Sequence, residues 1–333
     1  MIAVSLGILI LLVVLVGGTS FPLTEGAELE FNPDFKMAPY MDLETGLYGY
    51  IDIEGQVVIE PRYHYAEAFS EGIAVVAESG SKGTFYGYIN KKGDTVISLS
   101  YQYARGFHEG LAIVSQNGDL FVINKSGDIS HKIPDNMISG DYSYGMSPVY
   151  SSFDSDQSDV SNSGYIDRKG NIVLEIEMVE GYPFSEDLAQ IQVFVNEEDV
   201  KWGYINQEGT MVIDPIYENS EAFTEGMAAV AIRDSEGNKK WGYINQSGEF
   251  VIEPIFDSAF AFSENLAVVY VDDKGYGYID RNGQFVIGPA FKMATSYSNG
   301  YASVRTDATK FKCIDKTGVA RFTADNKLIF EFR

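Results

Sequence analysis

An eight-residue phrase recurs along the chain and constrains its fold more than any other feature. It is most complete at residues 202–209 and 241–248, where it reads Trp-Gly-Tyr-Ile-Asn-Gln-x-Gly, and residues 48–55 carry it with Tyr in the Trp position. Tandem repeats with a period of roughly 20 to 50 residues are typical of solenoids and propellers. The Asp or Asn of the phrase marks eight copies at spacings of 34 to 43 residues: Asp52, Asn90, Asn124, Asp167, Asn206, Asn245, Asp280 and Asp315.

Each copy has the pattern of short antiparallel strands. The phrase predicts a strand and then an Asp/Asn-x-x-Gly turn, in which the first side chain accepts a backbone hydrogen bond and the glycine has positive φ. A Val-Ile strand, a Phe-Ser/Thr-Glu segment and a strand of small residues follow, so the chain is predicted to be all-β. Because proline cannot donate to a sheet ladder, we expect it to end the Val-Ile strand in four copies. These prolines are Pro61, Pro215, Pro254 and Pro289.

The tyrosine of the phrase is predicted to be a core residue, although exposed aromatic rings could instead stack on sugars or hold peptides. It shares a sheet face with the residue two positions earlier, as in Trp202 with Tyr204. Cys313 takes the tyrosine position in the eighth copy and is expected to be a buried apolar side chain. As the only cysteine, it excludes an intrachain disulfide and a multi-cysteine metal site. The six tyrosines are Tyr50, Tyr88, Tyr165, Tyr204, Tyr243 and Tyr278.

The two ends of the array look like parts of one repeat. Residues 35–40 resemble the closing part of a copy, and residues 319–332 resemble only an opening part. In a closed ring these parts would complete one blade and remove the exposed edges of an open sheet. We therefore favour a propeller-like closed ring of eight repeats of about 38 residues. An open β-solenoid or array, which would more naturally carry polar caps, is the alternative.

The phrase, followed by Val-Ile-x-Pro and Phe-x-Glu-Gly-x-Ala, resembles the WG repeat family of bacterial proteins. The resemblance runs from about residue 35 to the C-terminus, so residues 35–333 are expected to form a single WG-repeat β domain. It implies all-β units and frequent location at the cell surface or envelope, and it brings no catalytic residues. The chain departs from the family pattern because Trp stands only at 202 and 241, with Tyr48, Tyr86 and Tyr276 as substitutes.

Residues 1–18 form an apolar and small-residue run. Its length suits a secretory signal peptide or a short membrane anchor, although no Lys or Arg precedes it. No cysteine follows, which excludes a lipoprotein anchor. We expect residues 1–20 to be a signal peptide or N-terminal membrane anchor and residues 21–34 to be a linker. The β domain is then extracytoplasmic, either secreted or anchored to the cell membrane by residues 1–18.

The chain is strongly acidic, with 24 Lys plus Arg against 48 Asp plus Glu and a net charge of −24. This balance argues against nucleic acid as a partner, because binding phosphates needs clustered basic residues. It also argues against anionic lipid surfaces, so membrane contact is expected only through the N-terminal apolar segment.

One position of the repeat carries an acidic residue in five copies. The side chain either hydrogen-bonds backbone at a turn or contributes to a ring of negative potential that would attract a cationic ligand. Asp154, Asp156 and Asp159 are different, because a calcium loop needs Gly and Glu where Asp159 and Tyr165 stand. Residues 151–163 are therefore expected to be a solvated surface loop. The five recurring acids are Glu71, Glu109, Glu186, Glu225 and Glu264.

No motif for catalysis, cofactor binding or metal binding is recognisable, and His64, His108 and His131 fall in different repeat positions. We therefore expect no enzyme and no cofactor. The predicted function is a non-enzymatic binding or scaffold module for an unidentified protein, peptide or glycan partner. The alternative is a polysaccharide-acting hydrolase that uses carboxylates within a β-ring. Such an enzyme needs clustered departures from the repeat, whereas a scaffold needs only regularity.

Overall fold

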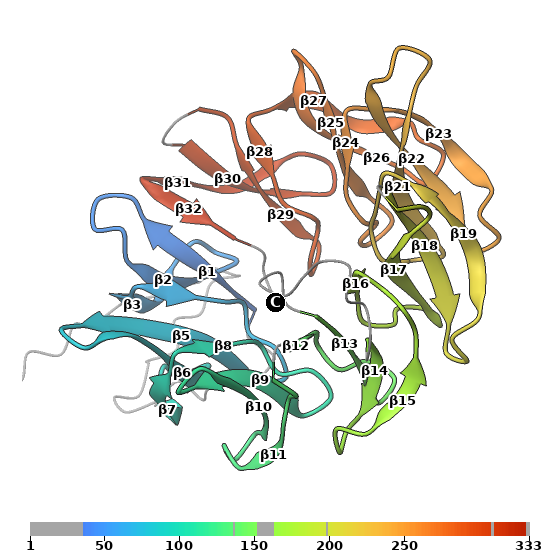
Figure 1. Ribbon diagram of the computed structural model, residues 1–333. Coiled ribbons are helices and arrows are strands. Elements are labelled where there is room, and N and C mark those ends of the chain that lie inside the picture. The colour runs from blue at the N-terminus through green and yellow to red at the C-terminus, as the bar shows by residue number, and fades with distance from the viewer. Residues whose placement is uncertain (1–35, 136, 152–162, 198, 308–309, 331–333) are drawn as a thin grey trace, which may run out of the picture. The chain divides into compact units, whose positions relative to one another are not determined.

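The chain folds into eight blades around a common centre (Figure 1). The computed structural model describes residues 36–135, 137–151, 163–197, 199–307 and 310–330, which hold 32 strands in eight four-stranded antiparallel sheets and no helix. Figure 1 shows β12 and β16 near the centre and β15 and β19 at the rim. The predicted all-β closed propeller is confirmed, and the open array is wrong.

Blades 1 to 4 each run from a short inner strand to an outer strand. Blade 1 contains β32 (Lys327–Ile329), β1 (Met37–Asp42), β2 (Tyr48–Asp52) and β3 (Val57–Tyr63). Blade 2 contains β4 (Tyr65–Ala66), β5 (Ile73–Gly80), β6 (Gly83–Asn90) and β7 (Thr95–Tyr101). Blade 3 contains β8 (Tyr103–Ala104), β9 (Leu111–Gln116), β10 (Asp119–Asn124) and β11 (Ile129–Lys132). Blade 4 contains β12 (Met137–Ser139), β13 (Met146–Ser151), β14 (Gly164–Asp167) and β15 (Ile172–Glu175).

Blades 5 to 8 have the same order. Blade 5 contains β16 (Glu180–Gly181), β17 (Leu188–Phe194), β18 (Val200–Asn206) and β19 (Met211–Tyr217). Blade 6 contains β20 (Asn219–Ser220), β21 (Met227–Arg233), β22 (Lys239–Asn245) and β23 (Phe250–Phe256). Blade 7 contains β24 (Ser258–Ala259), β25 (Ala267–Val271), β26 (Gly275–Ile279) and β27 (Phe285–Phe291). Blade 8 contains β28 (Met293–Ala294), β29 (Tyr301–Arg305), β30 (Lys310–Asp315) and β31 (Ala320–Asp325).

Blade 1 closes the ring with strands from both ends of the array. β32 pairs with β1 so that Ile329 faces Tyr40, and the N–H of Phe330 donates to the carbonyl of Pro39 at 3.0 Å. Tyr40 and Ile329 are both buried in one apolar cluster. The two partial repeats therefore complete one blade, as the sequence predicts, and β1 has no exposed inner edge.

The sequence repeat is offset from the blade. The copy that begins at Tyr48 supplies β2 and β3 to blade 1 and then β4 and β5 to blade 2. Each copy therefore joins the outer half of one blade to the inner half of the next, so no blade consists of a single copy.

The turn after the phrase forms as predicted. The Oδ1 atom of Asp52 accepts hydrogen bonds from the N–H groups of Glu54 and Gln56 at 3.0 and 2.7 Å. The turn glycine has a φ between 77° and 85° in all eight copies, a region that side chains with a Cβ rarely adopt.

The expectation that proline ends the second strand is wrong. β23 continues through Pro254 to Phe256, and the pairing of β22 with β23 shifts register between Trp241 and Tyr243. Proline is tolerated because it sits in a bulge on the outermost strand, where a missing N–H breaks no ladder bond. The same bulge explains the first glycine of the phrase, since a Cβ at Gly242 would lie 2.5 Å from the carbonyl oxygen of Ile252. Strands β3, β19 and β27 likewise continue through Pro61, Pro215 and Pro289.

The recurring tyrosine is a core residue, as predicted. All six such side chains are fully buried, and each ring lies 4.8 to 4.9 Å from an aromatic ring of the next blade, as Tyr243 does from Phe262. Trp202 and Tyr204 share one apolar cluster, in agreement with their predicted common face. Cys313 is also fully buried, and burial raises the pKa of its thiol to about 12, so its apolar role is confirmed.

Three expectations fall outside the described residues: the signal peptide or anchor over residues 1–20, the linker over 21–34, and the acidic loop with Asp154, Asp156 and Asp159. Within the described ranges, no helix has the length and apolarity needed to cross a membrane.

Candidate functional site

One residue in each blade directly follows the short inner strand, and we call this place the axial position. Its N–H donates to a carbonyl of the next strand at 2.8 to 3.1 Å, as Glu67 does to Val75. In six blades its own carbonyl accepts the hydroxyl of the recurring tyrosine of the preceding blade, at 2.8 or 2.9 Å. The axial backbone is thus held by the same two hydrogen bonds in six blades, whereas the axial side chains differ. The axial residues of blades 1 to 8 are Phe330, Glu67, Arg105, Gly140, Tyr182, Glu221, Phe260 and Thr295.

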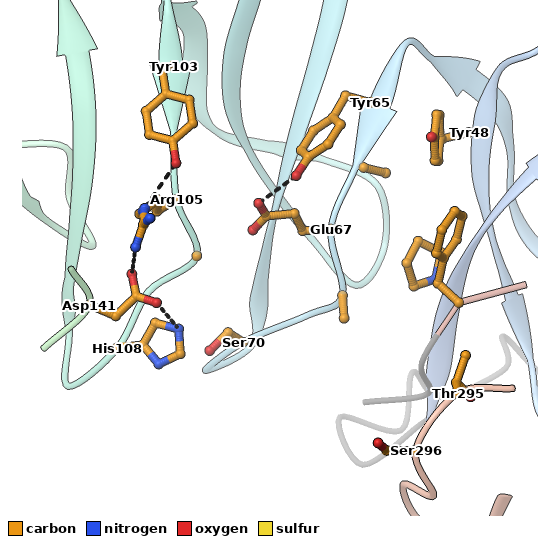
Figure 2. Close-up of a pocket in the computed structure, with 15 residues that line it drawn as sticks. Tyr48, Tyr65, Glu67, Ser70, Tyr103, Arg105, His108, Asp141, Thr295 and Ser296 are labelled. Atoms are coloured by element: carbon orange, nitrogen blue, oxygen red, sulfur yellow. Dashed lines mark hydrogen bonds and ion pairs between the residues drawn. The ribbon is translucent and has the colours of Figure 1, made fainter. Parts of the chain in front are cut away.

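A cavity of about 710 Å³ is lined by four of these residues, Phe330, Glu67, Arg105 and Thr295. Its walls come from blade 8, blades 1 to 3 and the inner end of blade 4 (Figure 2). Its aromatic and charged or titratable lining side chains are those of Tyr48, Tyr65, Glu67, Tyr103, Arg105, His108, Asp141 and Phe330.

Aromatic rings form one wall of the cavity. Phe330 stacks on Tyr48 with ring centroids 5.8 Å apart, and Tyr48 lies 6.3 Å from Tyr65. Tyr86 does not line the cavity but connects two rings that do, lying 5.7 Å from Tyr65 and 6.2 Å from Tyr103. Such a wall offers flat apolar faces together with hydroxyl groups, which suits sugar rings, peptide groups and organic cations.

Two polar groups face the cavity. The hydroxyl of Tyr65 donates to Oε1 of Glu67 at 2.8 Å. Burial raises the pKa of Glu67, and the bond from Tyr65 offsets only part of that rise. Glu67 is therefore a carboxylate held at an energetic cost, as expected for an acid withdrawn from water.

The second group is centred on Arg105 (Figure 2). Its Nε donates to the hydroxyl of Tyr103 at 2.9 Å and its Nη1 donates to Oδ1 of Asp141 at 3.3 Å. The other carboxylate oxygen of Asp141 lies 3.6 Å from Nε2 of His108. Burial alone would lower the pKa of Arg105, but Asp141 and Tyr103 outweigh it and the pKa is raised, so the guanidinium stays charged.

These polar residues are departures from the repeat. His108 replaces the Ser or Thr found at that position in blades 2 and 4 to 8, where Ser70, for example, donates to the carbonyl of Phe107 at 2.6 Å. Asp141 stands where blades 2, 3 and 5 to 8 have Ala, Gly, Pro or Ser. His108 was not expected to belong to a site, and Glu67, Arg105 and Asp141 were not predicted at all. Superimposing the copies of the repeat on their short inner strands would have revealed the four residues.

The five recurring glutamates serve the scaffold. Each carboxylate accepts a hydrogen bond, at 2.8 to 3.0 Å, from a backbone N–H of the following blade. Four of them also form ion pairs with basic residues of that blade, as Glu71 does with Lys125 at 3.0 Å. The hydrogen-bonding role is confirmed, but the bond crosses to the next blade instead of closing the glutamate's own turn. We call Glu71, Glu109, Glu186, Glu225 and Glu264 the clamp glutamates.

The histidines and the acids that the structure describes are candidate metal ligands. Among the described residues, no three His, Cys, Asp or Glu side chains come together in a way that could hold a metal ion. Each histidine has a different contact: His64 accepts from the N–H of Ser79, His108 contacts Asp141, and His131 contacts Tyr142.

A family model described as "WG containing repeat" matches the chain at residues 48–80, 86–118, 164–193, 202–234, 241–274 and 276–308. A search of the curated proteins finds no match. Among solved structures, the designed Ika8 protein is similar with a TM-score of 0.48 and 13% identity over 78% of this chain and 85% of that one. BamB from Moraxella catarrhalis gives a TM-score of 0.45 and 12% identity over 91% and 88% of the two chains.

Proposed function

The chain belongs to the WG containing repeat family, and we propose that it is a non-enzymatic binding or scaffold module that takes its ligand at the axial cavity. The observation that carries this proposal is that the residues repeated between copies and the residues that vary between copies have different roles. The recurring tyrosines, turn residues and clamp glutamates are used to pack and join blades. Four of the eight variable axial residues line one cavity together with His108 and Asp141, as expected where a regular scaffold carries a local function.

We place this module outside the cytoplasm. The apolar run over residues 1–18 supports this part of the proposal, because its length suits a secretory signal peptide or a membrane anchor. The net charge of −24 fits a protein that stays in solution and avoids anionic lipid surfaces. Fusing residues 1–20 to a reporter that is active only after export tests the location, and a reporter that remains silent would contradict it.

The chemistry of the cavity suits a peptide or glycan ligand. Aromatic rings pack against sugar faces or peptide groups, and the guanidinium of Arg105 and the carboxylate of Glu67 supply strong donors and acceptors. Titrating the protein with envelope peptides and polysaccharide fragments tests this. Because a charged hydrogen-bonding group is lost, Arg105→Gln should weaken binding about tenfold. The same charge change at the exposed Arg233, outside the cavity, is the control and should leave binding intact.

A polysaccharide hydrolase is a second candidate, supported by Glu67 and Asp141. Burial raises the pKa of Glu67 and the nearby charge of Asp141 adds to that rise. One carboxylic acid that holds its proton beside a second carboxylate is the pair that glycosidases use. Polysaccharide fragments that bind and are recovered uncleaved would exclude this candidate. Cleavage that disappears in Glu67→Gln would favour it over the binding module.

A further inference from the structure

The constellation around Glu67 has a counterpart elsewhere in the ring. In blade 1 the axial Phe330 lies 5.8 Å from Tyr48, and in blade 5 the axial Tyr182 lies 5.7 Å from Trp202 at the equivalent repeat positions. In each case the axial residue of the next blade is a glutamate, Glu67 in blade 2 and Glu221 in blade 6. Blades 2 and 6 are four blades apart in a ring of eight, so the two glutamates belong to opposite sides of the axis.

Neither glutamate has a cationic partner among the described residues. No Lys, Arg or His nitrogen in that part of the chain lies within 4.0 Å of the carboxylate of Glu67 or Glu221, whereas four of the five clamp glutamates form such ion pairs. Burial raises the pKa of both carboxyl groups. Each is a partly buried carboxyl group beside an aromatic pair, and in the second pair Tyr182 is exposed and supplies the accessible ring face, whereas Trp202 is buried.

The neighbouring charges leave both places negative. On the first side, Arg105 is paired with Asp141 and its charge also lowers the pKa of Glu67, but two carboxylates against one guanidinium leave a net negative charge. On the second side, burial raises the pKa of Tyr182, and the carboxylate of Glu180 in β16 is close enough to raise it further. A cation placed at either point would gain charge-assisted hydrogen bonds from the carboxylate and attraction to the ring faces.

We infer that the axis of the ring carries two equivalent seats, each for one ammonium or guanidinium group, and that the ligand presents two such groups at once. The first seat consists of Glu67 with Tyr48 and Phe330. The second consists of Glu221 with Tyr182, whose ring packs on the buried Trp202. This inference rests on the proposed binding function and narrows its ligand to a dication, either a free polyamine or two basic side chains of one peptide.

The test is a calorimetric titration with probes that differ in the number and spacing of amino groups. The probes are linear diamines of increasing length, a monoamine, a diol of matched length, and a short peptide with two lysines. We expect one diamine or peptide per chain, an optimum in diamine length, and binding at least about tenfold weaker for the monoamine, because only one seat is then filled. The diol should not bind.

Substituting each glutamate in turn tests each of the two seats separately. Glu67→Gln and Glu221→Gln should each weaken binding of the best dication about tenfold or more, since each removes one charged contact. Glu253→Gln makes the same change on the exposed outer strand β23 and is the matched control. Thermal melting of each variant checks that the ring is intact. Preference for the peptide over the diamines identifies a peptide ligand, and the reverse identifies a polyamine.

Three results would overturn the inference. If diamines bind no better than the diol, neither glutamate is part of a cation site. If Glu67→Gln loses affinity but Glu221→Gln does not, the seat at Glu221 does not exist. An equal loss of affinity in the Glu253→Gln control would mean that the dication responds only to the overall negative charge of the protein. If neutral envelope glycans bind in an Arg105-dependent way while dications do not, the binding function stands and only this inference falls.

Discussion

The hydroxyl group of the recurring tyrosine connects the repeated scaffold to the axial position, where the side chain varies between blades. Tyr243 in blade 6 donates to the carbonyl of Phe260, the axial residue of blade 7, at 2.9 Å. The same bond fixes Glu67 and Arg105, through Tyr50 and Tyr88. The recurring tyrosine thus holds the backbone of a position whose side chain is free to change, which is how a uniform scaffold can carry a local site.

Replacing this tyrosine should therefore loosen one blade junction without emptying the core. Tyr243→Phe keeps the ring against Phe262 but leaves the carbonyl of Phe260 without its donor. We expect a loss of about 1–2 kcal/mol in the free energy of unfolding, as for a broken buried hydrogen bond. Urea denaturation measures it. Tyr144→Phe, at an exposed ring, is the control, and an equal loss there would contradict the assignment.

Replacing Glu67 should instead increase the stability of the protein at neutral pH. Because burial raises its pKa in the folded state, the folded chain binds a proton at this group more tightly than the unfolded chain does. The stability linked to this proton is fully present below the unfolded pKa and is lost as pH rises through the folded pKa. Glu67→Gln, which keeps an acceptor for Tyr65, should therefore be more stable than the wild type at neutral pH, with the difference vanishing in acid.

Thermal melts of both proteins across that pH range measure the effect. A variant that is less stable than the wild type at neutral pH would mean that the ionised carboxylate supports the fold. Glu67 would then be a structural group of the same kind as the clamp glutamates, and a cationic ligand would relieve no energetic cost there.

At the scale of strands, the bulge in the outer pair accounts for both the glycine and the proline of the repeat. Gly242 approaches the backbone of Ile252 and Pro254 so closely that a Cβ has no room. Gly242→Ala should therefore cost about 2–4 kcal/mol, in the range of severe steric substitutions. Gly288→Ala is the matched control, because a Cβ at Gly288 in β27 would meet nothing within 4 Å. Chemical denaturation of both variants is the measurement, and similar losses would contradict a steric role for the bulge.

The outer strands also show where sequence reasoning succeeds and where it stops. The Asp52 turn and the buried Tyr50 were predictable because each depends on local chemistry repeated at a fixed spacing. The continuation of β3 past Pro61 was not, because a bulge depends on the partner strand and leaves no periodic mark.

The candidate site was not predictable for a related reason. Glu67 and Arg105 follow inner strands of only two residues, too short for alternation of apolar and polar side chains to be visible. His108 and Asp141 belong to consecutive blades and meet only because the ring brings the inner ends of blades 3 and 4 together. The eightfold repeat predicts the scaffold, whereas the site arises from contacts between copies.

For the whole molecule, closure was predictable because the two ends of the array are complementary fragments of one repeat. β32 supplies the inner strand that blade 1 lacks, and it buries Ile329 beside Tyr40. The other junctions are held by covalent continuity, by tyrosine hydroxyls and by the clamp glutamates. Blade 1 alone combines strands from opposite ends of the described chain, so it should be the place where the ring opens first.

Ending the chain after Asn326 tests this. The truncation removes β32 and exposes the inner edge of β1, and the buried Ile329 side chain alone should account for about 2–5 kcal/mol of lost stability. An unpaired edge strand also invites pairing with a second chain, so dimers or larger species are expected in light scattering. Ile329→Ala keeps the backbone pairing and should be destabilised but monomeric. A truncated chain that stays monomeric and melts like the intact protein would mean that the clamp glutamates and tyrosine bonds hold the ring without its closing strand.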